Sequence, residues 1–302
     1  MKALFTFLLF TSFAVFADAV ISTPFNIPRS TVVDINDPAT NLIYPLFIKT
    51  PASYNKQVEK QYPVIYLTDA YYEFQIVSGA TRYPMNIAVM EEAIIVGISY
   101  AKGSKGSSSR NRDYTPTFNK KWKDKTGEAK QHAKFIEKSV FDYIDTKYRT
   151  DPTNRTFIGN SLGGLFGTYI LLNKPSMFKN YILGSPSYWW DNEYIFTQEL
   201  EFAKQNVAIN ANVFIAIGEL ETIEFGAGYN MVGDAKEFYK RMLNWQSDNL
   251  NVKLMIIPQA DHATAFPTTA IQGLKWVLGK CDKANNCLLS PKKATTNNIL
   301  QK

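Results

Sequence analysis

Short apolar runs alternate with helical patterns along this chain, and that alternation limits the fold more than any other feature of the sequence. Eight runs rich in β-branched or aromatic residues are predicted strands: 31–35, 41–50, 62–70, 92–100, 155–161, 179–187, 212–220 and 251–260. Three segments carry apolar residues at helical spacing: 130–148, 162–175 and 234–248. Nearly unbroken apolar strands separated by helices predict an α/β fold, with a mostly parallel sheet covered on both faces. The first two strands have no helix between them, which predicts an antiparallel start.

The domain organisation is expected to be simple. The chain has 302 residues, 45% of them hydrophobic and 20% charged, which is enough apolar material for one large core. We find no repeat and no interdomain linker, so residues 20–289 are predicted to form a single domain. Residues 101–113 are expected to be a flexible Gly/Ser loop inside it, and residues 290–302 a polar tail.

Residues 1–19 have the layout of a secretory signal peptide: a lysine, then an apolar run, then small residues. We therefore expect a periplasmic or secreted protein, which would meet a membrane only if this segment were retained as an anchor. Cys281 and Cys287, the only cysteines, enclose a polar loop, and in an oxidising compartment we expect them to form a local disulfide.

The charge pattern argues against a nucleic-acid partner. The formal net charge is +6 and the sequence pI about 9.0, but the basic residues are scattered and form no tract. A well-solvated surface is the better interpretation.

The stretch Gly159-Asn160-Ser161-Leu162-Gly163 lies between a predicted strand and a predicted helix. Glycines two residues to either side remove the side chains that would obstruct a sharp turn at Ser161. Such a turn exposes the hydroxyl beside a helix N-terminus, the arrangement of a serine nucleophile. The backbone N–H of Leu162 is then a natural donor to an oxyanion.

A serine nucleophile requires a base, usually a histidine oriented by a carboxylate. The sequence has two histidines. His132 precedes the serine within a Lys-rich helix and is expected to be solvated there. His262 follows the last strand on a loop, in the order serine, acid, histidine that this architecture uses, and is the predicted base.

The acid is expected after the penultimate strand. Glu221 is favoured because it extends one residue further beyond the strand end, while Glu219 and Asp234 remain alternatives. The second oxyanion donor is expected from the loop after the third strand, at the backbone N–H of Ala70 or Tyr71. This chemistry needs no cofactor and no metal.

Several blocks together resemble the putative-esterase family of α/β-hydrolases, especially the branch with enterobactin-type siderophore esterases. These blocks are YPVIYLTDA, RNRDYTPTF, IGNSLGGLFGTYILLNKPSMF, SPSYWWDN, IGELE and ADHATAFP. The resemblance implies Ser161 as nucleophile, His262 as base and Glu221, in a Gly-x-x-acid position, as the acid. It also implies an ester substrate of small size, with a siderophore ester first and an acyl-carbohydrate ester second. A catalytically silent binding protein of the same fold is the alternative from another class, and a lipase is disfavoured because no long apolar lid is visible.

Two further blocks supply candidate substrate contacts. A free Arg110 or Arg112 would suit an anionic or phenolate-bearing substrate, whereas pairing with Asp113 would make them structural. Trp189 and Trp190 follow the sixth strand and are candidates for an aromatic wall.

Overall fold

The computed structural model describes residues 22–245 and 247–280. The predicted signal segment, the polar tail, Cys281 and Cys287 lie outside these residues. Among the described residues, no helix is both long and apolar enough to cross a bilayer.

All eight predicted strands are present, and they form one sheet in the order β1-β2-β4-β3-β5-β6-β7-β8. The strands are β1 (Ser30–Asn36), β2 (Ile43–Lys49), β3 (Tyr62–Leu67), β4 (Ile94–Ile98), β5 (Thr150–Asn160), β6 (Asn180–Gly184), β7 (Ala211–Gly218) and β8 (Leu250–Ile257). β1 pairs with β2 and β2 with β4 in antiparallel register, and every pairing from β4 to β8 is parallel. The predicted antiparallel start and parallel body are therefore confirmed.

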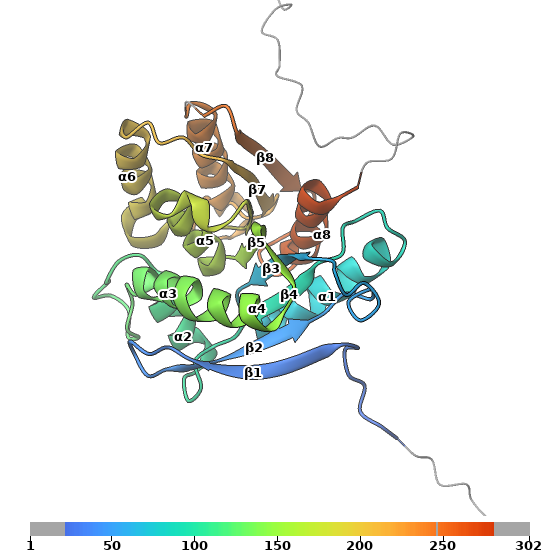
Figure 1. Cartoon of the computed structure of the whole chain (residues 1–302). Coiled ribbons are helices and arrows are strands. Elements are labelled where there is room, and N and C mark those ends of the chain that lie inside the picture. Colours follow the sequence, from blue (N-terminus) through green and yellow to red (C-terminus); the bar gives the residue numbers. More distant parts are fainter. Residues whose placement is uncertain (1–21, 246, 281–302) are drawn as a thin grey trace, which may run out of the picture.

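The helices cover both faces of this sheet (Figure 1). They are α1 (Ala70–Asn86), α2 (Gly106–Tyr114), α3 (Ala129–Phe135), α4 (Phe141–Lys147), α5 (Leu162–Asn173), α6 (Trp190–Lys204), α7 (Met231–Leu243) and α8 (Ala265–Leu278). A π-turn, η1 (Ile136–Val140), joins α3 to α4, and two short 3-10 turns are η2 (Pro175–Met177) and η3 (Ile223–Phe225). α1 and α8 pack on one face, and the larger group from α3 to α7 packs on the other.

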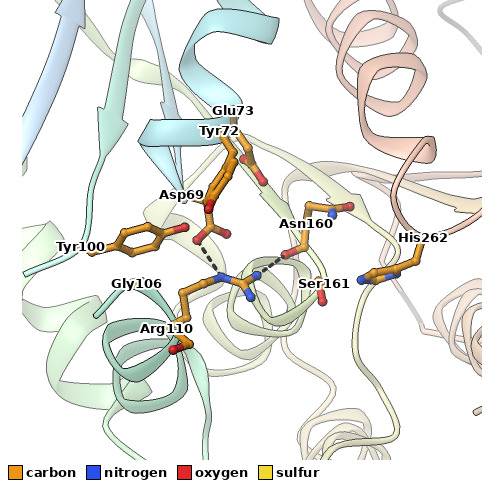
Figure 2. Close-up of a pocket in the computed structure, with 10 residues that line it drawn as sticks. Asp69, Tyr72, Glu73, Tyr100, Gly106, Arg110, Asn160, Ser161 and His262 are labelled. Carbon is orange, nitrogen blue, oxygen red and sulfur yellow. Dashed lines mark hydrogen bonds and ion pairs between the residues drawn. The ribbon is translucent and has the colours of Figure 1, made fainter. Parts of the chain in front are cut away.

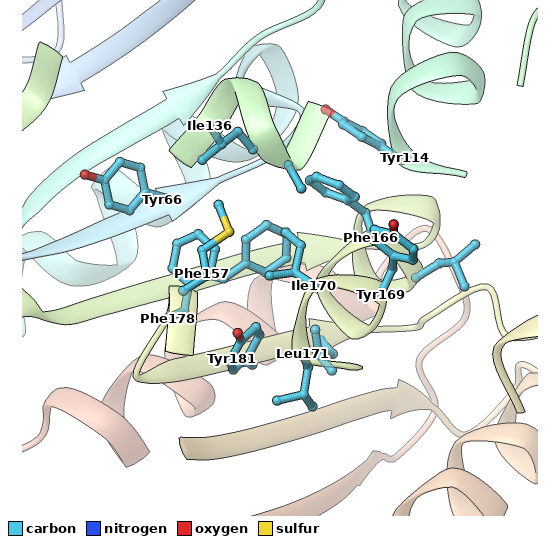
Figure 3. Packing of buried hydrophobic residues seen from close by; sticks show 14 of the residues in the cluster. Tyr66, Tyr114, Ile136, Phe157, Phe166, Tyr169, Ile170, Leu171, Phe178 and Tyr181 are labelled. Atoms are coloured by element: carbon cyan, nitrogen blue, oxygen red, sulfur yellow. The ribbon is translucent and has the colours of Figure 1, made fainter. Parts of the chain in front are cut away.

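Alternation along the strands builds a separate core on each face. In β5, Ile158 points to the α1/α8 side, and Phe157 points to the opposite core. Figure 3 shows Phe157 and Phe166 of α5 within that second core, where their rings meet edge to face at 6.0 Å. This packing fixes α5 against the sheet and so fixes the turn that connects β5 to it.

Two local expectations were wrong. Residues 101–113 are not simply a flexible loop, because α2 occupies residues 106–114. Tertiary hydrogen bonds order this helix: the Ser109 hydroxyl accepts from the backbone N–H of Ala101 (3.0 Å) and donates to Asp113 (2.9 Å). His132 is not solvated but buried at 3% exposure among aromatic rings, because its face of α3 packs onto α5.

Candidate active site

The chain bends sharply where β5 passes into α5, and Ser161 occupies the bend. Its φ of 59° and ψ of −119° lie outside the regions that ordinary residues favour. The Ser161 N–H donates to the carbonyl of Gly184 (2.9 Å), and the Ser161 carbonyl accepts from the N–H of Ser187 (3.1 Å). The packed strand and helix on either side therefore hold a strained backbone that presents the hydroxyl, as in a nucleophile elbow.

Two glycines allow the close approaches that the bend requires. A Cβ on Gly159 would lie 2.4 Å from the carbonyl oxygen of Gly163, closer than real Cβ contacts allow. A Cβ on Gly163 would lie 2.5 Å from the Thr68 hydroxyl, at the end of β3. The start of α5 therefore abuts the turn that leads from β3 into α1.

That contact brings two helix N-termini together. Leu162 is the first residue of α5, and Ala70 and Tyr71 are the first two of α1. The first N–H groups of a helix have no partner within it and carry the positive end of its dipole. Asp69, in a left-handed conformation (φ 50°, ψ 42°), turns the chain into α1. The predicted oxyanion donors are thus on two neighbouring helix starts.

Glu221 is joined to His262, with its Oε2 2.6 Å from Nδ1 of the imidazole. The other carboxylate oxygen accepts from the Ser185 hydroxyl (2.5 Å) and from the Gly218 N–H (2.8 Å). These partners satisfy a carboxylate that is only 2% exposed and fix its orientation. A bond from the carboxylate to Nδ1 leaves Nε2 as the nitrogen that can accept a proton.

The other two candidate acids lie elsewhere. The exposed Glu219 accepts from the backbone N–H of Gln259 (2.9 Å). Asp234 lies in the first turn of α7, where burial and then the charge of Glu193 raise its pKa to about 6. Neither makes a hydrogen bond to His262 among the contacts of the described residues.

A cavity of about 390 Å³ opens at this edge of the sheet. Ser161 and His262 both line it, and Figure 2 shows the imidazole turned toward the serine. The remaining lining residues are Asp69, Tyr72, Glu73, Tyr100, Gly106, Ser107, Arg110 and Asn160. The arrangement offers a hydroxyl, a carboxylate-oriented imidazole and paired N–H donors, which are the elements of acyl transfer.

Comparison with known proteins identifies the family. A family model described as "Putative esterase" matches residues 38–240. The chain belongs to this family. It is 31% identical over 274 residues to the ferri-bacillibactin esterase BesA of Bacillus subtilis, covering 85% of this chain and 92% of that protein.

Solved structures agree with the fold. The BES protein of Bacillus cereus superposes with a TM-score of 0.75 at 27% identity, covering 86% of this chain and 98% of that one. The siderophore hydrolase EstA of Aspergillus nidulans superposes with a TM-score of 0.72 at 20% identity, covering 85% of this chain and 97% of that one. The predicted α/β-hydrolase fold and the family resemblance are confirmed.

Neither predicted arginine of this esterase is free. The Nε of Arg110 lies 2.7 Å from the carboxylate of Asp69, and its Nη2 lies 3.4 Å from the Asn160 carbonyl. Arg110 therefore lines the cavity as half of an ion pair (Figure 2). Arg112 pairs with Asp113 through two bonds of 2.8 Å and is not among the residues that line the cavity. Arg112 therefore has the structural pairing with Asp113 that the sequence analysis considered, whereas the partner of Arg110 is Asp69.

The two tryptophans of the esterase are also outside the cavity lining. Trp190 is buried, and its indole N–H donates to the Thr117 hydroxyl (2.9 Å). Trp189 is partly buried and stacks on Tyr229, with ring centroids 4.3 Å apart and planes 3° apart.

Sequence reasoning missed three polar groups of the site. Ser187 places its hydroxyl oxygen 3.2 Å from that of Ser161. Asp69 holds Arg110, and Glu73 lines the cavity with one carboxylate oxygen lacking a hydrogen-bond partner among the described residues. Burial, and then the neighbouring Asp69, raise the pKa of Glu73 well above its usual value. The available signal for Glu73 was its four-residue spacing from Asp69, which places the two acids on one side of a helix.

Metal ligation gains no support from the described part of the chain, where no group of three or more His, Cys, Asp or Glu side chains is placed to hold a metal ion.

Proposed function

We propose that this esterase is a serine hydrolase that cleaves its ester through an acyl-enzyme on Ser161. The observation that carries the proposal is the contact between Glu221 and His262 at 2.6 Å, in a chain whose elbow serine lines the same cavity as that histidine. Each part alone is common, but their combination is the arrangement that activates a serine hydroxyl.

In the proposed reaction, the Ser161 oxygen attacks the ester carbonyl while its proton passes to Nε2 of His262. Glu221 remains ionised and stabilises the imidazolium that forms. The N–H of Leu162 and that of Ala70 or Tyr71 bind the developing oxyanion, and each such donor typically lowers the barrier by roughly 3 kcal/mol. His262 then protonates the departing alcohol, and a water molecule activated by the same histidine releases the acid.

For the substrate we propose a siderophore ester. The support is the similarity over most of the chain to BesA, a protein named as a ferri-bacillibactin esterase. The likeness to EstA, at 20% identity, supports the fold alone.

We also propose export, on the N-terminal pattern of residues 1–19. A periplasmic or secreted chain that begins after this segment, measured by N-terminal sequencing, would support it; an intact cytoplasmic chain would oppose it.

The replacement Ser161→Ala tests the mechanism. We expect turnover of p-nitrophenyl acetate to fall by about 10³-fold or more, since the nucleophile is lost. The melting temperature should stay the same, because within the described residues the hydroxyl forms a hydrogen bond only with the Ser187 hydroxyl. A variant that is folded and still turns over the ester at the wild-type rate would remove the proposal.

A further inference from the structure

A buried lysine lies at the edge of the sheet opposite the catalytic cavity. Lys49 is the last residue of β2, and it is only 5% exposed. β2 runs antiparallel to β4, whereas β4, β3 and β5 run parallel to one another, so β2 ends at the edge opposite the elbow that follows β5. Within the described residues, Lys49 takes part in no ion pair. A buried charge without a partner is costly, so this lysine requires a physical explanation.

The side chain of Lys49 lies on the side of the sheet that α1 covers. Side chains alternate along a strand, so Lys49 shares a face of β2 with Phe47. The Phe47 ring packs on Tyr71 and Phe74 of α1, with ring centroids 5.2 and 5.7 Å away. Both β2 and α1 run from the catalytic edge toward the opposite edge. Lys49 therefore lies beside the part of α1 that follows Phe74.

That part of α1 supplies a hydroxyl and a second cation. Ser78 and Arg82 follow Phe74 at four-residue spacing, which places all three along one side of the helix. Ser78 is buried, and its hydroxyl has no hydrogen-bond partner among the described residues. Arg82 is exposed. The helix thus presents a buried neutral donor and then a guanidinium beyond it.

The chain just before β1 supplies a third cation. Arg29 precedes Ser30, the first residue of β1, and Ser30 is paired with Lys49 in the sheet. The Nε of the exposed Arg29 donates to the carbonyl of Thr50 (3.1 Å), the residue that follows Lys49. Burial, and then the charges of Arg29 and Arg82, lower the pKa of Lys49 to about 8. The ammonium is therefore still mostly protonated at neutral pH, and we call Arg29, Lys49 and Arg82 the cationic cluster.

The elements around the cationic cluster carry few acids. Residues 22–33 and α8 contain none. The one acid of α1, Glu73, lies near the other end of that helix, in the wall of the catalytic cavity. Carboxylates near the cluster therefore come only from the two connections that join β2 to β3 and α1 to β4.

Three carboxylates in these two connections do not neutralise the cluster. Glu92 accepts from the Ser53 N–H (3.0 Å) and pairs with Lys60 (3.5 Å). Glu59 is exposed and Glu91 is half-buried, and neither forms an ion pair in the part of the chain that the structure describes. Among these residues, the cluster has three positive charges and no carboxylate within ion-pair distance.

We propose that the cationic cluster, with the Ser78 hydroxyl, is a binding site for a phosphate group, separate from the catalytic cavity. A phosphate offers several acceptor oxygens, which an ammonium and two guanidinium forks can bind together. Its negative charge would also offset the repulsion among the three cations. The inference does not depend on the proposed hydrolysis, because no residue of the cluster lines the catalytic cavity.

Two sources of phosphate share this chemistry, the free ion and the head group of a phospholipid. Exposed aromatic side chains adjoin the cluster in the sequence: Phe25, at 86% exposure, precedes Arg29 by four residues, and Tyr83, at 71%, follows Arg82 directly. Aromatic and basic side chains together are typical of surfaces that bind the interface of a bilayer. The test therefore has one arm for each source.

The first arm measures the dissociation constant for inorganic phosphate by calorimetry, at an ionic strength held constant with chloride. Lys49→Met keeps an unbranched side chain and removes its charge, and Arg29→Gln/Arg82→Gln removes the two exposed charges. Wild type should bind phosphate, and both variants should bind it about tenfold more weakly or worse, because charge-assisted contacts are lost.

A melting experiment separates a binding site from a lysine with a merely structural role. Without phosphate, Lys49→Met should melt at a higher temperature than wild type, because the variant buries no unpaired charge. Phosphate should raise the melting temperature of wild type, since it binds the folded state, and should leave that of Lys49→Met unchanged.

The second arm measures sedimentation with phosphatidylglycerol vesicles, and with phosphatidylcholine vesicles as the zwitterionic comparison. If the lipid head group is the source, wild type should sediment with the anionic vesicles severalfold more than either cluster variant does. The difference should shrink at high salt, because the exposed part of the attraction is screened.

A matched control carries the charge change of the double arginine variant on the other face of the sheet. Lys236 and Lys240 are exposed on α7, which packs on the larger core. Lys236→Gln/Lys240→Gln should match wild type in both arms. Turnover of p-nitrophenyl acetate should stay within about twofold of wild type in every variant, because the cluster lies at the edge opposite Ser161.

The outcomes are distinct. Weaker binding by the cluster variants in either arm, with an unaffected control, supports the site, and a loss confined to the vesicle arm identifies the lipid head group as the source. No binding by wild type in either arm, equal binding by the cluster variants, or equal losses in the control would overturn it. Failure of the proposed function has a separate readout, since wild type would then not turn over p-nitrophenyl acetate.

Discussion

Ser161, at the bend between β5 and α5, has a backbone conformation that residues other than glycine rarely adopt. A non-glycine residue at φ 59° and ψ −119° costs free energy, and the surroundings must compensate for that cost. Here the hydrogen bonds to Gly184 and Ser187 do so, and they belong to the strand end next to the elbow. The residue with the strained backbone therefore also carries the hydroxyl that is proposed to react.

At the residue scale the acid is open to a sharp test. In Glu221→Gln, the amide can still accept from Gly218 and Ser185 through its oxygen, which leaves its NH₂ facing Nδ1 of His262. The imidazole must then accept at Nδ1 and carry its proton on Nε2, where it cannot take one from Ser161. We expect kcat to fall roughly 10³–10⁴-fold, measured with p-nitrophenyl acetate.

The matched control is Glu219→Gln, two residues away and exposed. It should stay within about twofold of wild type. A larger loss of kcat in Glu219→Gln than in Glu221→Gln would show that Glu219, and not Glu221, orients the imidazole.

At the scale of elements, the strands and the elbow could be predicted from the sequence, whereas the ordered connections could not. The eight strands were predictable because buried parallel strands are continuous apolar runs. α2 was not, since its Gly/Ser-rich sequence has weak helical propensity, and tertiary bonds such as that from Ala101 to Ser109 order it.

The same limit applies to the site. Ser161 and His262 could be predicted from a local motif and from chain order. The pair of Asp69 with Arg110 could not, because it joins residues 41 positions apart on different elements. Its discovery changes the interpretation of Arg110 from a free anion binder to a neutralised wall residue.

The close approach of α5 to β5 can be tested by comparing two glycine substitutions, one at the elbow and one in α1. Gly159→Ala should destabilise the protein by about 3 kcal/mol or more, because its Cβ would meet the backbone of Gly163 at 2.4 Å. Gly79→Ala, in the exposed interior of α1 with nothing within 4 Å of the new Cβ, should stabilise it by roughly 0.5–1 kcal/mol. Urea unfolding of both variants gives the comparison, and equal changes would show that the close approach at the elbow has no particular cost.

At the scale of the whole molecule, the two faces of the sheet are packed by different cores, and His132 is buried in the larger one. Its ring contacts Tyr44, Tyr114, Phe135 and Phe166, and neither nitrogen has a hydrogen-bond partner among the described residues. The sequence could not reveal this, because the lysines around His132 suggested a solvated helix.

This burial predicts a dependence of stability on pH. Burial lowers the pKa of His132 below its usual value, so the unfolded chain takes up a proton at a higher pH than the folded protein does. Wild type should therefore lose stability as the pH falls through about 6.5, whereas His132→Leu lacks that contribution. The free energy of unfolding of the variant relative to wild type should be higher at pH 5 than at pH 8. A relative stability that is the same at both values would contradict the assignment of a buried neutral imidazole.

The measurement that bears most directly on the account is covalent labelling with an alkyl fluorophosphonate, followed by peptide mass spectrometry. Ser161 should form the phosphorus–oxygen bond with loss of fluoride, because His262 activates its hydroxyl. We expect one adduct, on the peptide that contains Ser161, formed at the wild-type rate in His132→Leu and far more slowly in His262→Ala. An adduct on another serine, or one formed equally fast without the His262 imidazole, would contradict the account.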